Sequence, residues 1–190
     1  VYTPIALKRG APMAAVESGY LRLPAGVPMG GYTARDAAFG GTRTRPRDLR
    51  QSNWTQMFHP SAGQLTGVPL QTLWLSNGDR HMVILRIDLV AAFDGMVFEI
   101  EKRLSAITGL DLTGQVAMVT SHSHSSPAAH HRSLQFALGF DRYDPRVFER
   151  IVDQAVSQAL RAHGRLAPAR LGVGIMPNAD PADGDQLWRD

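Results

Sequence analysis

Met82-Val-Ile-Leu-Arg-Ile-Asp-Leu-Val90 is the stretch that decides the fold, and it is apolar at seven of its nine positions. A run of this length and composition is typical of a β-strand that is buried on both faces, as in the centre of an α/β sheet. Leu70 to Leu75 forms a second apolar run, and Ser76-Asn-Gly-Asp79 separates the two. Because Asn-Gly supplies the positive φ angles of a tight turn, we expect the two runs to form a β-hairpin.

Helical and strand-like segments alternate after this hairpin. Asp94 is a suitable cap for a helix that Gly109 ends, and residues 115–120 form another short apolar strand. Asp144-Pro145 opens a second helix that ends at Gly164, and residues 169–175 have the pattern of a further strand. Together with a short strand over residues 17–23, this order predicts an α/β fold, a mixed β-sheet with helices packed on it.

The composition narrows the possible functions. The chain has 190 residues, of which 44% are hydrophobic and 19% charged, as in globular domains. It has no run near the roughly 18 apolar residues of a membrane helix, so we expect no transmembrane segment. Cysteine is absent, which excludes disulfides, thiolate nucleophiles and Cys-ligated zinc. The densest basic run, Arg43-Thr-Arg-Pro-Arg-Asp-Leu-Arg50, has no interleaved aromatic residues, and we expect no nucleic-acid partner.

The strongest chemical feature is Thr120-Ser-His-Ser-His-Ser-Ser-Pro127, which begins where an apolar strand ends. Active-site groups of α/β folds are commonly found at such strand ends. In extended backbone, residues i and i+2 project to the same side, so His122 and His124 could face one cavity. With no cysteine available, His and carboxylate ligands for zinc are the natural hypothesis. The alternative is a polar loop with two solvated or hydrogen-bonded histidines.

Several other polar and aromatic residues are weaker candidates. Asp88 could support a metal-bound histidine or merely cap a loop. His130 and His131 are expected in a polar loop. Structural or solvated roles are expected for His59, His81 and His163, a solvated turn rather than calcium binding for Asp180, Asp183 and Asp185, and core packing for Trp54, Phe58 and Trp74.

Ser121-His-Ser-His-Ser-Ser-Pro127 resembles the Thr-His-Thr-His-Ser-Gly-Pro segment of the neutral, non-lysosomal ceramidase family, with Ser126 at the position of the glycine. Residues 17–32 are similar to the opening strand, Pro-Gly turn and Met-x-Gly-Tyr element of that family. Residues 73–89 look like its hairpin ending in Asp, and residues 145–172 look like its helix and Leu-x-Pro-x-Arg strand entry. The resemblance therefore extends over nearly the whole chain.

The resemblance implies a zinc-dependent hydrolase that cleaves the N-acyl amide of ceramide to a sphingoid base and a fatty acid. It implies that His122 is a zinc ligand and that His124 lies beside the metal and assists catalysis. One zinc ion is expected, with the remaining ligands, a His, a Glu and a Tyr, outside this chain. A lipid-like N-acyl substrate and a secreted or periplasmic location follow from the same resemblance.

By this resemblance, residues 1–190 form the N-terminal portion of a ceramidase-like catalytic domain with no internal boundary. We expect a chain truncated or nicked after Asp190, whose fold is incomplete without a following segment. The remainder of the same polypeptide, or a second chain, is then the expected partner. Two alternatives stay open: a related hydrolase of another amide or ester, and a non-catalytic binding or surface protein that retains the fold.

Overall fold

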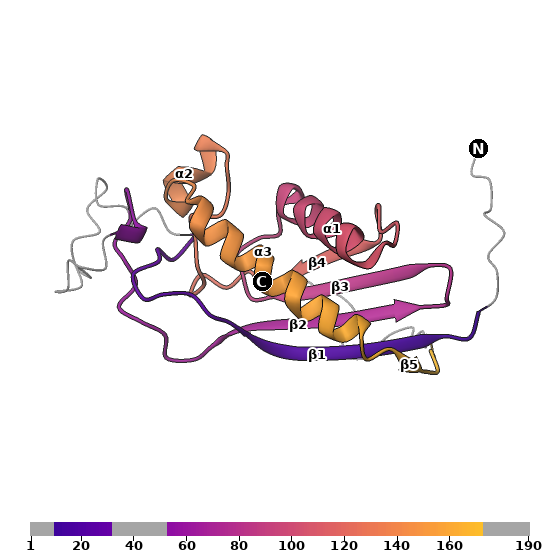
Figure 1. Ribbon diagram of the computed structural model, residues 1–190. Coiled ribbons are helices and arrows are strands. Elements are labelled where there is room, and N and C mark those ends of the chain that lie inside the picture. The colour runs from indigo at the N-terminus through magenta and orange to yellow at the C-terminus, as the bar shows by residue number, and fades with distance from the viewer. Residues whose placement is uncertain (1–9, 32–52, 173–190) are drawn as a thin grey trace, which may run out of the picture.

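The computed structural model describes residues 10–31 and 53–172, which form a mixed five-stranded sheet with helices packed against it (Figure 1). The strands are β1 (Met13–Leu21), β2 (Val68–Ser76), β3 (His81–Ile87), β4 (Val116–Thr120) and β5 (Ala167–Pro168). The helices are α1 (Asp94–Thr108), α2 (Leu134–Phe140) and α3 (Pro145–His163). The predicted α/β class is therefore confirmed.

The strand order is β4-β3-β2-β1-β5. β1, β2 and β3 are antiparallel neighbours, and the β2–β3 pair is the hairpin expected from the Asn-Gly turn. β4 is parallel to β3, because α1 carries the chain back between them. The predicted strand over residues 169–175 is wrong where it can be compared: pairing with β1 involves Ala167 and Pro168, and residues 169–172 lie beyond β5. Residues 173–175 lie outside the described ranges.

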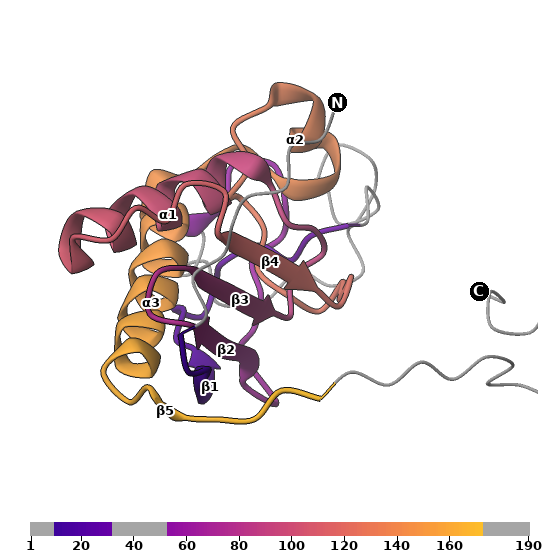
Figure 2. The ribbon, with the colours of Figure 1, turned by 90° about the vertical axis from the view of Figure 1, so that its right-hand side faces the viewer.

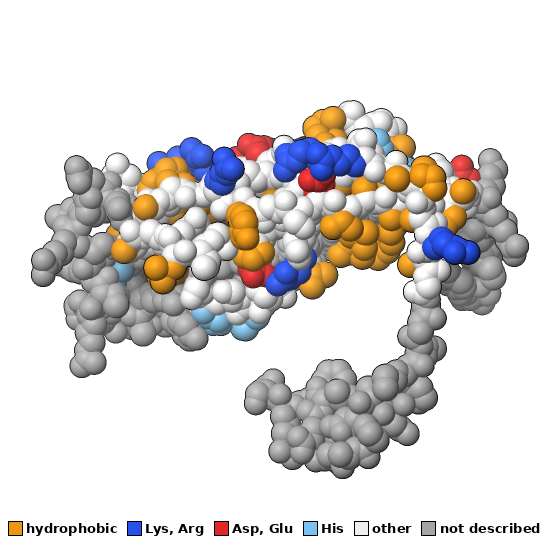
Figure 3. Space-filling view, turned by 90° about the horizontal axis from the view of Figure 1, so that it is seen from below, with side chains coloured by type: hydrophobic (Ala, Val, Ile, Leu, Met, Phe, Trp, Pro, Cys, Tyr) orange, Lys and Arg blue, Asp and Glu red, His pale blue; other side chains and the backbone are white. Residues whose placement is uncertain are grey.

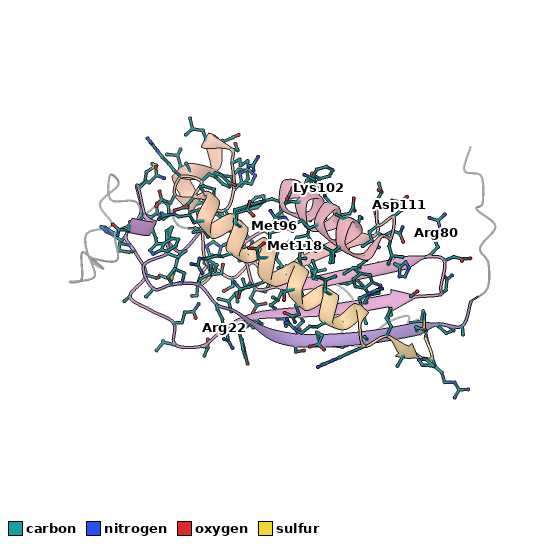
Figure 4. All side chains as sticks on the ribbon, viewed as in Figure 1. Arg22, Arg80, Met96, Lys102, Asp111 and Met118 are labelled. Carbon is teal, nitrogen blue, oxygen red and sulfur yellow. The ribbon has the colours of Figure 1, made fainter. Side chains whose placement is uncertain are left out.

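α1 and α3 cover one face of the sheet (Figure 2). The side chains between these helices and the sheet are fully buried, and they include Trp74, Leu85, Ile100, Leu104, Ile151 and Val152. Core packing was the prediction for Trp74 and Phe58, and both are buried. Met96 is part of this core and Met118 packs against it (Figure 4). Arg80, Lys102 and Asp111 are exposed on the outside of the molecule.

The ends of α1 and α3 show which of the capping residues predicted from the sequence are the observed caps. The Asp144 carboxylate accepts a hydrogen bond from the backbone N–H of Arg146 at 2.8 Å, so it caps α3 as expected. Gly109 ends α1 in the left-handed conformation, at φ 73°. The predicted cap Asp94 is wrong by one residue, because Phe93 occupies the cap position without a side-chain bond. Asp94 instead lies in the first turn, where a carboxylate complements the helix dipole.

The other face of the sheet is open among the described residues. Val83, Leu85 and Ile87 of β3 are fully buried, whereas Met82 and Arg86, which point to the other face, are exposed and Ile84 is only half-buried. The expectation that this strand is buried on both faces is therefore wrong for this part of the chain. Hydrophobic side chains gather on the surface toward the β5 end of the molecule (Figure 3).

No helix in the part of the chain that the structure describes combines the length and the apolar character needed to cross a bilayer.

Candidate functional site

His122 lies just beyond the carboxyl end of β4, next to the end of the parallel strand β3. Its ring Nδ1 is 2.7 Å from the carbonyl oxygen of Val90. A carbonyl oxygen can only accept, so Nδ1 is the donor, and in the neutral ring this tautomer places the lone pair on Nε2. The residue is exposed to solvent. His122 therefore has one nitrogen fixed by the backbone and the other available to a ligand.

The rings of His122 and His124 are 4.9 Å apart between centroids and nearly perpendicular, at 83°. The structure thus brings the two predicted site residues together. It does so by a route the spacing did not suggest, because the backbone of His122 has a φ of 57° rather than an extended value. A non-glycine residue in this left-handed region is uncommon, and such conformations occur preferentially at functional sites.

Residues 28–31 form one wall of this site. The backbone N–H of Ala128 donates to the Pro28 carbonyl at 2.7 Å, and that of Gly30 donates to the Ser126 carbonyl at 3.2 Å. An antiparallel bridge between Met29 and Pro127 lies between these two bonds. The segment therefore runs alongside the end of the His-Ser-His loop and holds it against the rest of the molecule. We refer to residues 28–31 as the strap.

Ser126, at the position of the family's glycine, is buried, with 2% of its surface exposed. Its hydroxyl donates a hydrogen bond to the carbonyl oxygen of Ser123 at 2.6 Å. The backbone N–H of Ser125 also contacts the Ser123 hydroxyl, at 3.3 Å. The extra hydroxyl is accommodated because it closes the loop on itself, so this departure from the family segment leaves the loop compact.

Asp141 anchors a second segment near the strap. Its buried carboxylate accepts backbone hydrogen bonds from Gln56, Met57 and Phe58, at 2.9, 2.9 and 3.2 Å. Residue Ser61, a little further on, then exchanges backbone hydrogen bonds with the turn before the strap. Asp141 was not among the site residues predicted from the sequence. The Gly-Phe-Asp-Arg context carries no signal for a partner more than eighty residues away.

His130 contradicts the prediction of a polar loop. Only 2% of its surface is exposed, and its ring lies 5.5 Å from the ring of Phe93 and 5.6 Å from that of Phe140. Burial lowers the pKa of His130 to about 4. The neighbouring His131 is only partly buried, and burial lowers its pKa less far. His130 is therefore neutral at physiological pH and forms part of a small aromatic core under the loop.

His81 and His163 have the structural roles expected of them. The Trp74 indole N–H donates to Nδ1 of His81 at 3.1 Å, and the His163 ring stacks 4.7 Å from Trp74. Burial, with a contribution from His163, lowers the pKa of His81. This cluster lies where β3 begins, whereas His122 lies beyond the opposite end of that strand.

Asp88 forms an ion pair with Arg86, with Oδ1 3.0 Å from Nη2. The hydrogen-bond acceptor for the ring of His122 is the carbonyl of Val90 instead. A backbone carbonyl is present at every residue, so no sequence signal could have indicated Val90. The acidic residues 180–185 and the basic run 43–50 lie outside the described ranges.

Histidine ligands of zinc usually donate their second ring nitrogen to a carbonyl or carboxylate, and His122 has this arrangement. A catalytic zinc site needs three protein ligands and an open position. Across residues 10–31 and 53–172, no three His, Asp or Glu side chains gather closely enough to hold a metal ion. The donor chemistry therefore fits one part of a zinc site, and the other ligands would have to come from elsewhere.

The fold is shared with solved ceramidases. The crystal structure of neutral ceramidase from Pseudomonas aeruginosa superimposes with a TM-score of 0.62 and 19% identity, over 85% of this chain and 23% of that chain. A structure described as ceramidase complexed with C2 superimposes with a TM-score of 0.61 and 19% identity, over 83% of this chain and 22% of that chain. These matches define the chain as having the α/β fold found in part of those proteins.

The sequence identifies the family. A model of the neutral/alkaline non-lysosomal ceramidase N-terminal region matches residues 74–179, more than half of the chain. The chain belongs to the neutral/alkaline non-lysosomal ceramidase family. The neutral ceramidase of Pseudomonas aeruginosa is 30% identical over 104 residues, which is 53% of this chain and 16% of that relative. The chain thus matches about a sixth of the length of its curated relative.

Proposed function

We propose that this chain supplies part of the active site of a zinc-dependent hydrolase that cleaves the N-acyl amide bond of ceramide or a ceramide-like lipid. The products would be a sphingoid base and a fatty acid. The observation that carries the proposal is the pair His122 and His124, whose rings lie 4.9 Å apart at the end of β4 in a chain of the ceramidase family. Their position and their donor chemistry match what amide hydrolysis at a metal requires.

His122 would hold the zinc ion through Nε2, because Nδ1 donates to Val90. Zinc, when bound, lowers the pKa of a water molecule toward about 7 and polarises the scissile carbonyl. The hydrogen bond to Val90 fixes the ring orientation and tautomer of His122 and makes Nε2 a better donor of its lone pair. His124, beside it, is placed to stabilise negative charge on the carbonyl oxygen or to pass a proton to the leaving amine.

We further propose that another polypeptide segment completes the site and covers the open face of the sheet. One row across this face is Val16, Leu73, Ile84 and Ala117, which are neighbours in register on four successive strands. Val16 is 65% exposed and Met82, in the next row, is 47% exposed. Contiguous apolar surface of this kind is typical of an interface.

The occupant we infer is the kind of polypeptide that makes up the rest of the ceramidase relatives, in one chain with residues 1–190 or as a second chain. Only 23% of the solved ceramidase chain is matched by this one. The unmatched remainder of that solved chain is long enough to bring the other zinc ligands to His122 and to bury the open face.

The test uses the polypeptide in which this chain is complete with its remaining segments. Metal analysis should find about one zinc ion per molecule, and the protein should release fatty acid from an N-acyl sphingoid base. His122→Ala should lose the zinc and the hydrolysis, while His131→Ala, in the same loop, should keep both. Full hydrolysis by His122→Ala would overturn the mechanism. A protein that binds zinc but hydrolyses only other amides or esters would favour the related hydrolase. A protein that neither binds zinc nor hydrolyses any of these substrates would favour a non-catalytic binding protein.

A further inference from the structure

We propose that Gly31 is the positioning residue for His124, and that the absence of a side chain at Gly31 sets the orientation of this imidazole. The part of the proposal that concerns catalysis rests on the function proposed above, whereas the part that concerns ring position does not. Gly31 lies on the strap, far from His124 in the sequence. Neither the His-Ser-His segment nor the glycine-rich turn indicates by itself that the two meet.

The observation is a steric one. A Cβ atom built on Gly31 would lie 1.9 Å from Nδ1 of His124, 2.3 Å from Cε1 and 2.8 Å from Cγ. Non-bonded heavy atoms are in favourable contact at roughly 3.5 to 4.0 Å, so an alanine methyl would occupy the same space as the ring. The three nearest atoms are Nδ1 and its two bonded neighbours. The edge of the ring that carries Nδ1 therefore faces the backbone of Gly31, and Nε2 lies on the side of the ring further from it.

The strap cannot easily retreat from such a clash. The backbone N–H of Gly31 donates to the Gly139 carbonyl at 2.7 Å, and the bonds of Gly30 and Pro28 to residues 126 and 128 hold the strap just before it. The adjacent Gly30 is also confined, because a Cβ there would lie 3.2 Å from the ring of Phe140. Because these hydrogen bonds hold the backbone at Gly31 and just before it, the group that we expect to move is the imidazole of His124.

Movement of this ring would have a chemical consequence. Relief of the clash requires a shift of more than about 1 Å, and displacements of this size can reduce catalysis by roughly 100-fold. The ring of His122 lies only 4.9 Å away, so the pair would lose its mutual arrangement. Gly31→Ala should therefore lower kcat much more than it raises KM, because the group displaced is an imidazole proposed to act on the reacting atoms.

The chain contains a matched control. Gly78 has a φ of 94°, close to the 97° of Gly31, but a Cβ at Gly78 would meet nothing within 4 Å. Gly78→Ala therefore places a side chain at a similar positive φ, but at a site with open space. Any effect seen with Gly31→Ala and not with Gly78→Ala reports the contact with His124 and not the left-handed conformation.

The decisive experiment is a double-mutant comparison that needs neither metal nor substrate. Gly31→Ala, Gly78→Ala, His124→Ala and the double variant Gly31→Ala/His124→Ala are each measured by denaturant unfolding. The imidazole NMR signals of the seven histidines are recorded in the single glycine variants. We expect Gly31→Ala to lower the unfolding midpoint more than Gly78→Ala and to shift the signals of His124 but not those of His81. In the His124→Ala background the extra loss should disappear, because the ring that clashes is gone.

Each alternative outcome decides the question. If Gly31→Ala does not fold but the double variant does, the steric coupling is supported even more directly. If both fail to fold, or if the loss is unchanged without the ring, Gly31 serves only the strap and the proposal is overturned. Coupling together with no ceramide hydrolysis by the longer polypeptide proposed above would leave the positioning intact and refute the proposed function. Hydrolysis by Gly31→Ala at the wild-type kcat would refute the positioning role alone.

Discussion

Nδ1 of His122 donates a hydrogen bond to the carbonyl oxygen of Val90, and this 2.7 Å contact joins the loop after β4 to the segment between β3 and α1. It is made by a residue whose φ is 57°, so the side-chain orientation and the backbone conformation are determined together. His122 thus has an uncommon backbone conformation and also an exposed imidazole whose orientation is fixed by a hydrogen bond.

The left-handed backbone of His122 should make stability sensitive to the shape of its replacement. His122→Asn loses the bond to Val90 but should keep more stability than a branched replacement, because Asn tolerates this conformation well. His122→Val should cost about 1–3 kcal/mol of unfolding free energy, because a branched Cβ is strained there. Equilibrium unfolding in urea measures both. Equal stability of the Asn and Val variants would mean that the backbone at this position is not left-handed.

His130 should make the folded protein less stable in mild acid. Its pKa is about 4 in the folded protein, lowered by burial, and about 6.5 in the unfolded chain. Between these values the unfolded state binds the extra proton, so stability falls as the pH falls from about 6.5 to about 4 and then levels off for this group. The full difference corresponds to roughly 3 kcal/mol.

His130→Leu should remove most of this dependence on pH, while His131→Leu should remove a smaller part, because His131 is only partly buried. Both comparisons use unfolding midpoints measured between pH 7 and pH 4. A His130→Leu variant with the same acid slope as the wild type would show that another group is responsible.

Asp141 should be essential for the wall of the site. Its carboxylate accepts three backbone bonds from residues 56–58, and its own φ is 62°. Asp141→Ala leaves three N–H donors without this partner and should cost roughly 3 kcal/mol or more. Asp141→Asn keeps an acceptor oxygen for these N–H groups, so it should lose clearly less. Urea unfolding measures both losses, and hydrogen exchange at Met57 and Phe58 would locate the effect. Unchanged exchange in the alanine variant would contradict the assignment.

A charged substitution on the open face of the sheet should affect stability differently in the 190-residue chain and in the longer polypeptide proposed above, which we call the completed protein. Ile84→Lys should cost the 190-residue chain little, because Ile84 is only half-buried and lies on the uncovered side. In the polypeptide that includes the remaining segments, the same change should cost several kcal/mol, since it would place an unpaired charge in an interface.

Leu85→Lys is the control for the helix-covered face, because Leu85 is fully buried in the described structure. It should be strongly destabilising in both proteins. Thermal unfolding of the two variants, each made in both proteins, gives the comparison. A small effect of Ile84→Lys in the completed protein would show that this face stays exposed to water.

The sequence was a good guide to elements whose signals are local. The Asn-Gly turn, the capped start of α3 at Asp144 and the αL glycine at Gly109 each depend on a few adjacent residues, and each was confirmed. The pattern failed for the two-sided burial of residues 82–90 and for the strand over 169–175. Apolar character shows that a strand has two faces that could be buried, but not which neighbours are present to bury them.

The sequence by itself determined the α/β class, the position of His122 and His124 at a strand end, and membership of the ceramidase family. Only the tertiary structure decided that Val90 orients His122, that Gly31 confines His124 and that His130 is buried among phenylalanines. The physical reason is the range of the interactions. Turns, caps and side-chain periodicity are set by bonds between near neighbours in the chain. The contacts that shape the site join segments up to about a hundred residues apart, and these meet only when the whole sheet has formed.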